Sequence, residues 1–367
     1  MAAARHGGDR AGVDGARAAA GVPHNADLMR ELESGVAPVD TGWWHTVVGL
    51  WHLARPEIWT VSLLPFYTGW VMASHQLLPG LGLWAAFWDG ALRHGATMHE
   101  FLSTLATFLR QARPVLVGAA VLGPLGWGAT IYINDLNDIE GDRLNPRKAN
   151  SPLLRGVVSV ATSRRAMYCF AVAAAVGAFT ISWTFLALVV ACGLLGWAYS
   201  APPLRWKTKP GLDLMVNAVG VGSLTLFAGW SIARPLGDFP FVTLPAGLLT
   251  GVGVYVPTLL MDLLPDRASG YTTLGARLGP ERTYRIGWWA WVAANLDLIV
   301  LAATGQVLSR TALPILAVFV PVLLYEYHAG IGRARDQVEL MRGIVICSVT
   351  FFATATLVAL TYTHVWR

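Results

Sequence analysis

Two short acidic motifs hold the residues of this sequence whose types and spacing could carry out chemistry. In the first, Asn-Asp-Leu-Asn-Asp-Ile-Glu-Gly-Asp, an oxygen-bearing side chain recurs every four residues at Asn134, Asp138 and Asp142, and Asp135 follows the first of them. On a helix, this spacing places the recurring side chains on one face. Because like charges so placed repel each other, a bound cation is the simplest compensation, and oxygen ligands suit Mg²⁺ or Ca²⁺ rather than zinc.

The second motif repeats this spacing of acidic residues after a later hydrophobic stretch, where Asp262 and Asp266 again stand four residues apart. In proteins, Mg²⁺ typically binds a few carboxylates and completes its shell with phosphate oxygens and water. If the fold brings the two motifs together, they predict a clamp for a diphosphate. The alternative is that these acids are solvated loop residues, which a single motif would leave open.

Basic side chains stand close to both motifs in the sequence. Arg and Lys could bind further phosphate oxygens and stabilise the charge that develops on a leaving group. The alternative is topological, because cytoplasmic loops of membrane proteins are rich in Lys and Arg whatever their role. The candidates are Arg143, Arg147, Lys148, Arg155, Arg205, Lys207, Lys209 and Arg277.

The composition predicts that a membrane surrounds these motifs. Apolar residues make up 54% of the 367 residues and charged residues only 13%, about half the usual share of soluble domains. The mean hydropathy is +0.50. These values exclude a set of soluble domains and predict an integral membrane protein whose solvent is the lipid bilayer. The three cysteines show no CxxC or Cys/His spacing, so neither a zinc site nor a disulfide framework is predicted.

Apolar stretches long enough for a helix to cross about 30 Å of hydrocarbon follow one another along most of the chain. They predict an all-α, polytopic membrane protein with about nine transmembrane helices. The predicted spans are 57–74, 116–137, 166–182, 184–200, 214–233, 243–261, 286–304, 311–328 and 343–363.

The remaining segments flank or interrupt this transmembrane domain, which is assigned to 41–367. Residues 1–40 are rich in Ala, Gly, Arg and Asp without a sustained apolar run, which predicts a disordered N-terminal tail. Residues 75–115 form a long connection with an amphipathic pattern at 101–110. This pattern predicts an insertion that lies at the membrane interface.

The Lys and Arg residues alternate with the predicted spans. Most of them precede the first span or fall in every second connection, including the connections that carry the acidic motifs. By the positive-inside rule, the N-terminus and the active-site face are predicted to be cytoplasmic, in the cell membrane. This topology accounts for the net charge of +5, so no nucleic-acid partner is predicted.

These residues resemble the motifs of the UbiA superfamily of intramembrane prenyltransferases. The first motif is similar to the family's NDxxDxxxD, and the second to its DxxxD, which a GxxTL-like stretch follows from Gly270. The stretch YSAPPLRWK from Tyr199 resembles the tyrosine–lysine segment between the motifs, and Arg55-Pro56 resembles the opening of the first span. The resemblance covers about residues 50–365.

The resemblance implies a helical bundle around a central cavity, with Mg²⁺-dependent cleavage of an isoprenoid diphosphate donor. It also implies that a lipophilic acceptor attacks the resulting carbocation; a carotenoid, a quinone precursor or another polycyclic or aromatic compound would serve. The implied Mg²⁺ ligands are Asn134, Asp135, Asp138, Asp142, Asp262 and Asp266, and the implied catalytic residues are Asp135, Asp138, Asp262, Asp266 and Tyr199. The candidates for binding the diphosphate are Arg55, Arg143, Lys148, Arg205 and Lys207.

Within the superfamily, three stretches look most like the lycopene elongase branch, which prenylates a carotenoid. They are RPEIW from Arg55, GDRLNPRK from Gly141 and YSAPPLRWKTKP from Tyr199, the last of which is also similar to chlorophyll synthases. Two positions depart from the family's pattern. Tyr271 stands where a basic residue is common, and Ser151 stands where Arg commonly precedes a proline.

Further polar residues fall inside the predicted spans. Asp213 and Asn217 stand four apart at the start of the fifth span and are candidates for the substrate cavity; the alternative is a helix-end carboxylate. Asn295 and Asp297 lie within the seventh span. An acid there could take a proton from the final cation, but a hydrogen bond to a neighbouring helix is the favoured interpretation.

Two other functions stay open on the sequence alone. A membrane terpene cyclase of the same superfamily would ionise the same donor but let the chain attack itself, and the acidic motifs do not separate the two reactions. A secondary transporter is less favoured, because transporters usually place their polar groups near the middle of the membrane. The acidic motifs here stand at the predicted cytoplasmic ends of spans.

Overall fold

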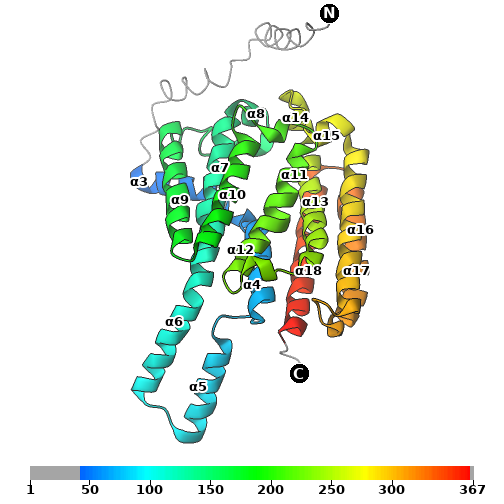
Figure 1. Ribbon diagram of the computed structural model, residues 1–367. Helices are drawn as coiled ribbons and strands as arrows, with labels where there is room; N and C mark the ends of the chain where they lie inside the picture. Colours follow the sequence, from blue (N-terminus) through cyan, green and yellow to red (C-terminus); the bar gives the residue numbers. More distant parts are fainter. Residues whose placement is uncertain (1–41, 364–367) are drawn as a thin grey trace, which may run out of the picture.

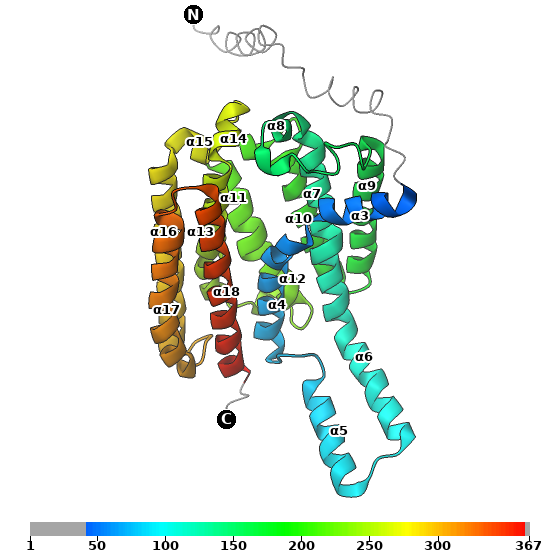
Figure 2. The same cartoon turned by 180° about the vertical axis from the view of Figure 1, so that it is seen from behind.

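The protein is a bundle of long helices, and the computed structural model describes residues 42–363. The predicted N-terminal tail at 1–40 therefore lies outside the described residues. Within the described range every regular element is helical, so the all-α prediction is confirmed. Short helices α8 (Ile139–Arg143), α14 (Leu263–Ala268) and α15 (Leu274–Leu278) gather at one end of the bundle (Figures 1 and 2), which we call the motif end.

Helices occupy each of the predicted spans. In chain order they are α4 (Thr60–Ser74), α6 (Met98–Ala120) with α7 (Gly126–Asn137), α9 (Val160–Phe179), α10 (Trp183–Ser200), α11 (Leu212–Val219) with α12 (Thr225–Ser231), α13 (Leu244–Met261), α16 (Pro280–Thr304), α17 (Leu313–Glu326) and α18 (Gln337–Tyr362). Among the described residues, seven helical stretches are long and apolar enough to cross a membrane, and α4 and α9 are not among them. The predicted count of nine is therefore approximate.

The connection at 75–115 folds as a helical hairpin of α5 (Leu81–His94) and α6, which projects beyond the bundle at the end opposite to the motif end (Figure 1). The amphipathic stretch at 101–110 is helical as predicted, but it belongs to α6 and is not a separate element. With α7, α6 forms one stretch of 40 residues, about 60 Å long. Because that is twice the ~30 Å hydrocarbon thickness, the stretch is too long for a single crossing without a projecting end.

The hairpin is stabilised by local contacts. Thr97 and Glu100 form a capping box at the start of α6: the Thr97 hydroxyl accepts from the Glu100 amide at 3.2 Å, and the Glu100 carboxylate accepts from the Thr97 amide at 2.7 Å. This satisfies amide groups that the first turn of a helix leaves without partners. The ring of Trp84 packs against Phe101 and Phe108 across the hairpin.

Small residues allow α4 to pack backbone to backbone on α12. A Cβ atom at Gly69 would lie 2.0 Å from the Leu226 carbonyl oxygen, and one at Gly229 would lie 1.8 Å from the Phe66 carbonyl oxygen. Close approach at small residues is a common way to pack helices in membranes. The contact fixes α4, at whose head Arg55 stands.

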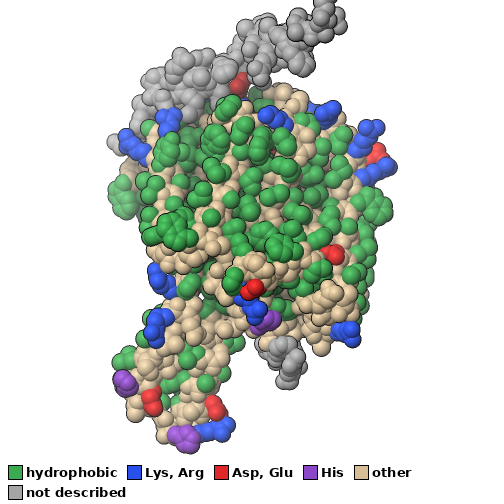
Figure 3. Space-filling view, viewed as in Figure 1, with side chains coloured by type: hydrophobic (Ala, Val, Ile, Leu, Met, Phe, Trp, Pro, Cys, Tyr) green, Lys and Arg blue, Asp and Glu red, His purple; other side chains and the backbone are tan. Residues whose placement is uncertain are grey.

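The outer surface of the bundle is apolar. Exposed large apolar side chains occur along most of the long helices, for example Val176 at 59% and Val349 at 64% exposure. Figure 3 shows apolar side chains over the flank of the bundle, with Lys and Arg at its ends and on the hairpin. A flank of this kind suits contact with lipid chains.

Candidate active site at the motif end

Each acidic motif lies where a long helix breaks and a short one follows. α7 ends at Asn137, Asp138 adopts φ −113° and ψ 8°, and α8 begins at Ile139. α13 ends at Met261, Asp262 adopts φ −91° and ψ 1°, and α14 begins at Leu263. The prediction of one continuous helical face at 134–142 is therefore modified, because the chain turns at Asp138. α8 and α14 contact each other, so the two motifs meet.

Two cations pair with Asp135 in the first motif. The Asp135 carboxylate, 3% exposed, accepts from the Arg55 guanidinium at 2.5 Å and from the Lys148 ammonium at 2.9 Å. Lys148 also donates to Asp142 at 2.9 Å. Arg55 precedes α4 and Lys148 follows α8. The two cations therefore reach Asp135 on α7 from segments before and after it in the sequence.

The connection between α10 and α11 supplies two further cations, which contact Asp138 and Asn134 in the first motif. The Arg205 guanidinium donates to Asp138 at 2.9 Å, and the Lys207 ammonium pairs with Asp138 as well. Lys207 also donates to the Asn134 side-chain oxygen at 2.9 Å. The predicted basic residues Arg205 and Lys207 therefore do reach the acidic motif.

The second motif is tied to the first by Arg147, whose guanidinium pairs with Asp262. Asp266 accepts a hydrogen bond from the Thr273 hydroxyl at 2.9 Å. The basic residue that the family pattern commonly has at position 271 is absent, but Arg205 comes from another loop, donates to the Tyr271 hydroxyl at 2.9 Å and lies 4.9 Å from its ring centroid. The Arg205 guanidinium therefore supplies positive charge beside position 271, although it belongs to a different loop.

Tyr199 lies deeper, where its hydroxyl is 2.9 Å from that of Tyr255 on α13. Asp213 acts as a local anchor: one oxygen accepts from the amides of Gly211 and Leu214, and the other accepts from the amide of Leu274 at 2.8 Å. These hydrogen bonds fasten the start of α11 to α15. Asn217 donates to the Asp213 carbonyl oxygen at 3.0 Å.

One predicted residue stays apart, and several others join the site. Arg143 is exposed on α8, and no ion pair found within 42–363 includes it. Arg147, one of the basic candidates named from the sequence, pairs with Asp262, whereas sequence reasoning did not assign Tyr255 or Tyr271 to the site. Tyr255 has no local signal in the sequence because its partner, Tyr199, lies on another helix.

Burial makes the carboxylates poorly solvated. It raises the pKa of Asp142 to about 6, although Lys148 opposes the rise, and it raises the pKa of Asp266 to about 6, although the Thr273 hydroxyl opposes it. Burial also lowers the pKa of Lys207, against the effect of Asp138. Each charged form is therefore less favourable here than in water.

The donor set fits a hard divalent cation. It consists of carboxylate and amide oxygens at one end of the bundle, and Asp135 Oδ2 is buried without a hydrogen-bond partner. As the side chains stand, no group of three acidic residues in the described part of the chain is close enough to coordinate one ion. Lys and Arg pair with most of these carboxylates, so a metal ion would have to displace these cations.

Comparison with known proteins identifies the family. The model of the UbiA prenyltransferase family matches residues 101–342. The chain belongs to the UbiA prenyltransferase family. It is 32% identical over 216 residues to a lycopene elongase/hydratase from Halobacterium salinarum, covering 56% of this chain and 72% of that one. It is 27% identical over 322 residues to the lycopene elongase/hydratase of Haloferax volcanii, covering 85% and 91%.

A solved structure supports the same fold. The structure of a UbiA homolog from Archaeoglobus fulgidus bound to GPP and Mg²⁺ superposes with a TM-score of 0.62, at 20% identity, over 85% of this chain and 99% of that one. The family match and the curated relatives show that this UbiA protein is a prenyltransferase, and its long apolar helices show that it is an integral membrane protein.

Proposed function

We propose that this UbiA enzyme uses Mg²⁺ to transfer a prenyl group from an isoprenoid diphosphate to a lipophilic acceptor. The observation that carries the proposal is the ion-pair network at the motif end, which gathers both acidic motifs and Arg55, Arg147, Lys148, Arg205 and Lys207 at one site. Oxygen ligands for a metal and nitrogen donors for phosphate are what a metal-diphosphate complex needs.

Mg²⁺ would be held by oxygens of Asn134, Asp135, Asp138, Asp142, Asp262 and Asp266. When bound, it would neutralise charge on the diphosphate and make it a better leaving group. The cations that now pair with these carboxylates would turn to the remaining phosphate oxygens. Arg55 and Arg205 carry planar guanidinium groups, which can bind two phosphate oxygens at once.

In the transfer, the bond between C1 of the prenyl group and the diphosphate oxygen breaks, and the electron pair leaves with the diphosphate. The acceptor supplies the pair for the new carbon–carbon bond, and the cation left on the acceptor then loses a proton to the released diphosphate or to water. Tyr199 and Tyr255 are suited to the intervening cation, because aromatic faces attract positive charge and their packing excludes water. Water at this position would quench the cation as an alcohol.

For the acceptor, we propose a carotenoid or a similarly extended lipophilic molecule. The proposal draws on the two lycopene elongase/hydratase relatives. We further propose that the motif end faces the cytoplasm in the cell membrane, because Lys and Arg concentrate in the connections at this end.

The test is product analysis by mass spectrometry on detergent-purified protein. Donors of increasing length, from dimethylallyl to geranylgeranyl diphosphate, would be supplied with Mg²⁺, with and without a carotenoid-containing lipid extract. We expect a mass gain of one prenyl unit on the acceptor that needs both Mg²⁺ and the extract. A cyclised hydrocarbon formed from the donor alone would instead identify a terpene cyclase, and an uncleaved donor in folded protein would overturn the proposal.

A further inference from the structure

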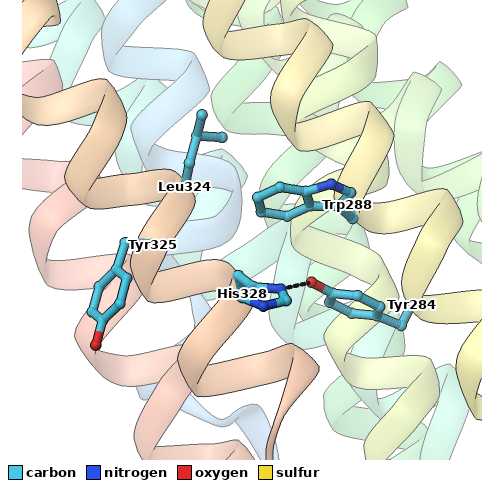
Figure 4. A pocket seen from close by; sticks show the side chains of 5 residues that line it. All are labelled: Tyr284, Trp288, Leu324, Tyr325 and His328. Carbon is cyan, nitrogen blue, oxygen red and sulfur yellow. Dashed lines mark hydrogen bonds between the residues drawn. The ribbon is translucent and has the colours of Figure 1, made fainter.

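An open groove lies on the outer surface between α16 and α17, away from the acidic motifs. It offers ≈ 350 Å³ and is lined by Tyr284, Trp288, Leu324, Tyr325 and His328 (Figure 4). The Tyr284 hydroxyl is hydrogen-bonded to His328 Nδ1 at 2.9 Å. The groove thus combines apolar aromatic walls with one polar pair, and nothing in the proposed transfer uses it.

The groove is preformed by a local change in helix geometry. α17 continues as a π-helix, η9 (Tyr327–Gly332), which adds a residue to the turn that carries His328. At the end of η9, a Cβ at Gly332 would lie 2.5 Å from the Tyr284 ring, so only glycine lets the ring lie against this backbone. The buried ring of Tyr327, 1% exposed, supports two of the lining residues, because its centroid lies 6.3 Å from those of Tyr284 and Trp288.

The depth of the groove matches the boundary between lipid headgroups and acyl chains. α16 begins at Pro280 at the motif end. With a rise of 1.5 Å per residue, Tyr284 lies about 6 Å and Trp288 about 12 Å along the helix from its start. Tyr and Trp favour this level of the bilayer, because one part of each ring is apolar and another is polar.

The charge around the polar edge is positive. Arg333 follows η9 directly, is exposed and interacts electrostatically with Tyr284. Arg282 and Arg335 are exposed at the same end. Of the nearby acids, Glu281 is already paired with Arg285 at 2.7 Å, and Glu339 accepts the backbone amide of Arg335. Asp336 caps the start of α18, where it accepts two backbone amides.

We propose that this groove binds an anionic phospholipid from the bilayer leaflet at the motif end. The phosphate would lie at Arg333 and the Tyr284–His328 pair, and an acyl chain would pack on Trp288 and Leu324. Positive charge at the polar edge favours an anionic over a zwitterionic headgroup. Because both helices line the groove, the lipid would stabilise α16 against α17.

The test is native mass spectrometry of the full chain released from detergent, with added phosphatidylglycerol or phosphatidylcholine of identical acyl chains. We expect one phosphatidylglycerol to be retained in preference to phosphatidylcholine. Arg333→Gln and His328→Ala, both at exposed positions, should weaken that binding about tenfold, as expected for loss of a charge-assisted contact.

Two neighbouring tryptophans on α16 distinguish specific lipid binding in the groove from general contact with lipid. Trp288 lines the groove, whereas its neighbour Trp289 is 64% exposed and is not part of the lining. Trp288→Ala should weaken phosphatidylglycerol binding, and Trp289→Ala should leave it unchanged. Equal retention of the two lipids, or equal loss in the two tryptophan variants, would overturn the proposal. If Trp288→Ala does not fold, Arg333→Gln and His328→Ala decide the question.

Discussion

At the scale of single residues, Asp138 is the centre of the candidate site. It stands at the helix break and accepts from both Arg205 and Lys207, so its carboxylate positions two cations that come from a different connection. Replacing it by Asn keeps the shape but removes the charge. Both cations would then lack their acidic partner, and one proposed metal ligand would be weakened.

We therefore expect Asp138→Asn to lower the rate of product formation by about 10²-fold or more, the range seen when one group that stabilises charge is removed. The rate would be measured by mass spectrometry of the prenylated product. Asp89→Asn is the matched control, because Asp89 is an exposed hairpin carboxylate paired with Arg93. An Asp138→Asn enzyme as active as this control would contradict the assignment.

The pKa values of Asp142 and Asp266, both raised to about 6, predict how metal binding depends on pH. Ligand carboxylates must be deprotonated, so Mg²⁺ competes with protons as the pH falls through 6. We expect the affinity to be nearly constant above about pH 7 and to fall at lower pH, with protons released on binding near pH 5.5. Calorimetry in buffers of different ionisation enthalpy would measure this release, and an affinity independent of pH from about 5 to 7.5 would exclude it.

At the scale of the elements, the breaks and the close helix contacts position the site. Gly69 and Gly229 let α4 approach α12 at backbone distance, and Arg55, which pairs with the first motif, stands five residues before α4 begins. The spacing of apolar residues predicts these helices but not their contact. An apolar stretch does not show which of its faces contacts lipid and which contacts another helix, because both surroundings are apolar.

Gly69→Ala should destabilise the protein by about 1–3 kcal/mol, because the added methyl group would meet the Leu226 carbonyl oxygen and force the helices apart. Thermal unfolding in detergent would report the change. Gly90→Ala on α5 is the control: its Cβ meets nothing within 4 Å, so the higher helix propensity of Ala should leave stability unchanged or raise it by up to about 1 kcal/mol. A Gly69→Ala protein as stable as the Gly90→Ala protein would count against this contact.

The sequence predicts the motif residues and the helical stretches because both depend on spacing along the chain. It does not predict long-range partners such as Arg147 and Asp262, which are 115 residues apart. Nor does it predict that the helix expected over 116–137 begins as early as Met98, in one stretch of 40 residues. Pro124 would ordinarily interrupt a helix, but the π-helix η2 (Val121–Leu125) accommodates it.

At the scale of the whole molecule, the motif end and the hairpin lie at opposite ends of the bundle (Figure 2). If the motif end is cytoplasmic, the hairpin turn must lie on the other side of the membrane. We expect a cysteine at Ala96, in this turn, to react with a membrane-impermeant maleimide in intact cells. A cysteine at Asn150, near the motif end, should react only after permeabilisation.

These cysteines would be introduced into a chain whose native Cys169, Cys192 and Cys347 are replaced by Ala. Labelling at Asn150→Cys from outside, with Ala96→Cys protected, would reverse the proposed orientation without affecting the proposed chemistry.

The pairing of carboxylates with Lys and Arg at the site has a thermodynamic consequence. A metal ion that binds alone must leave those cations without acidic partners, and a diphosphate that binds alone must leave the carboxylates without basic ones. When both bind, each set finds a new partner. The two ligands should therefore bind with positive heterotropic cooperativity, each raising the affinity of the other by the same factor, typically about 5–150-fold.

Calorimetric titration of Mg²⁺ with and without a non-cleavable diphosphate analogue would measure this factor, and equal affinities would exclude cooperativity. With such coupling, an empty site binds free magnesium or inorganic phosphate more weakly than it binds magnesium and a diphosphate together. It stays available to the one ligand that brings both charges together.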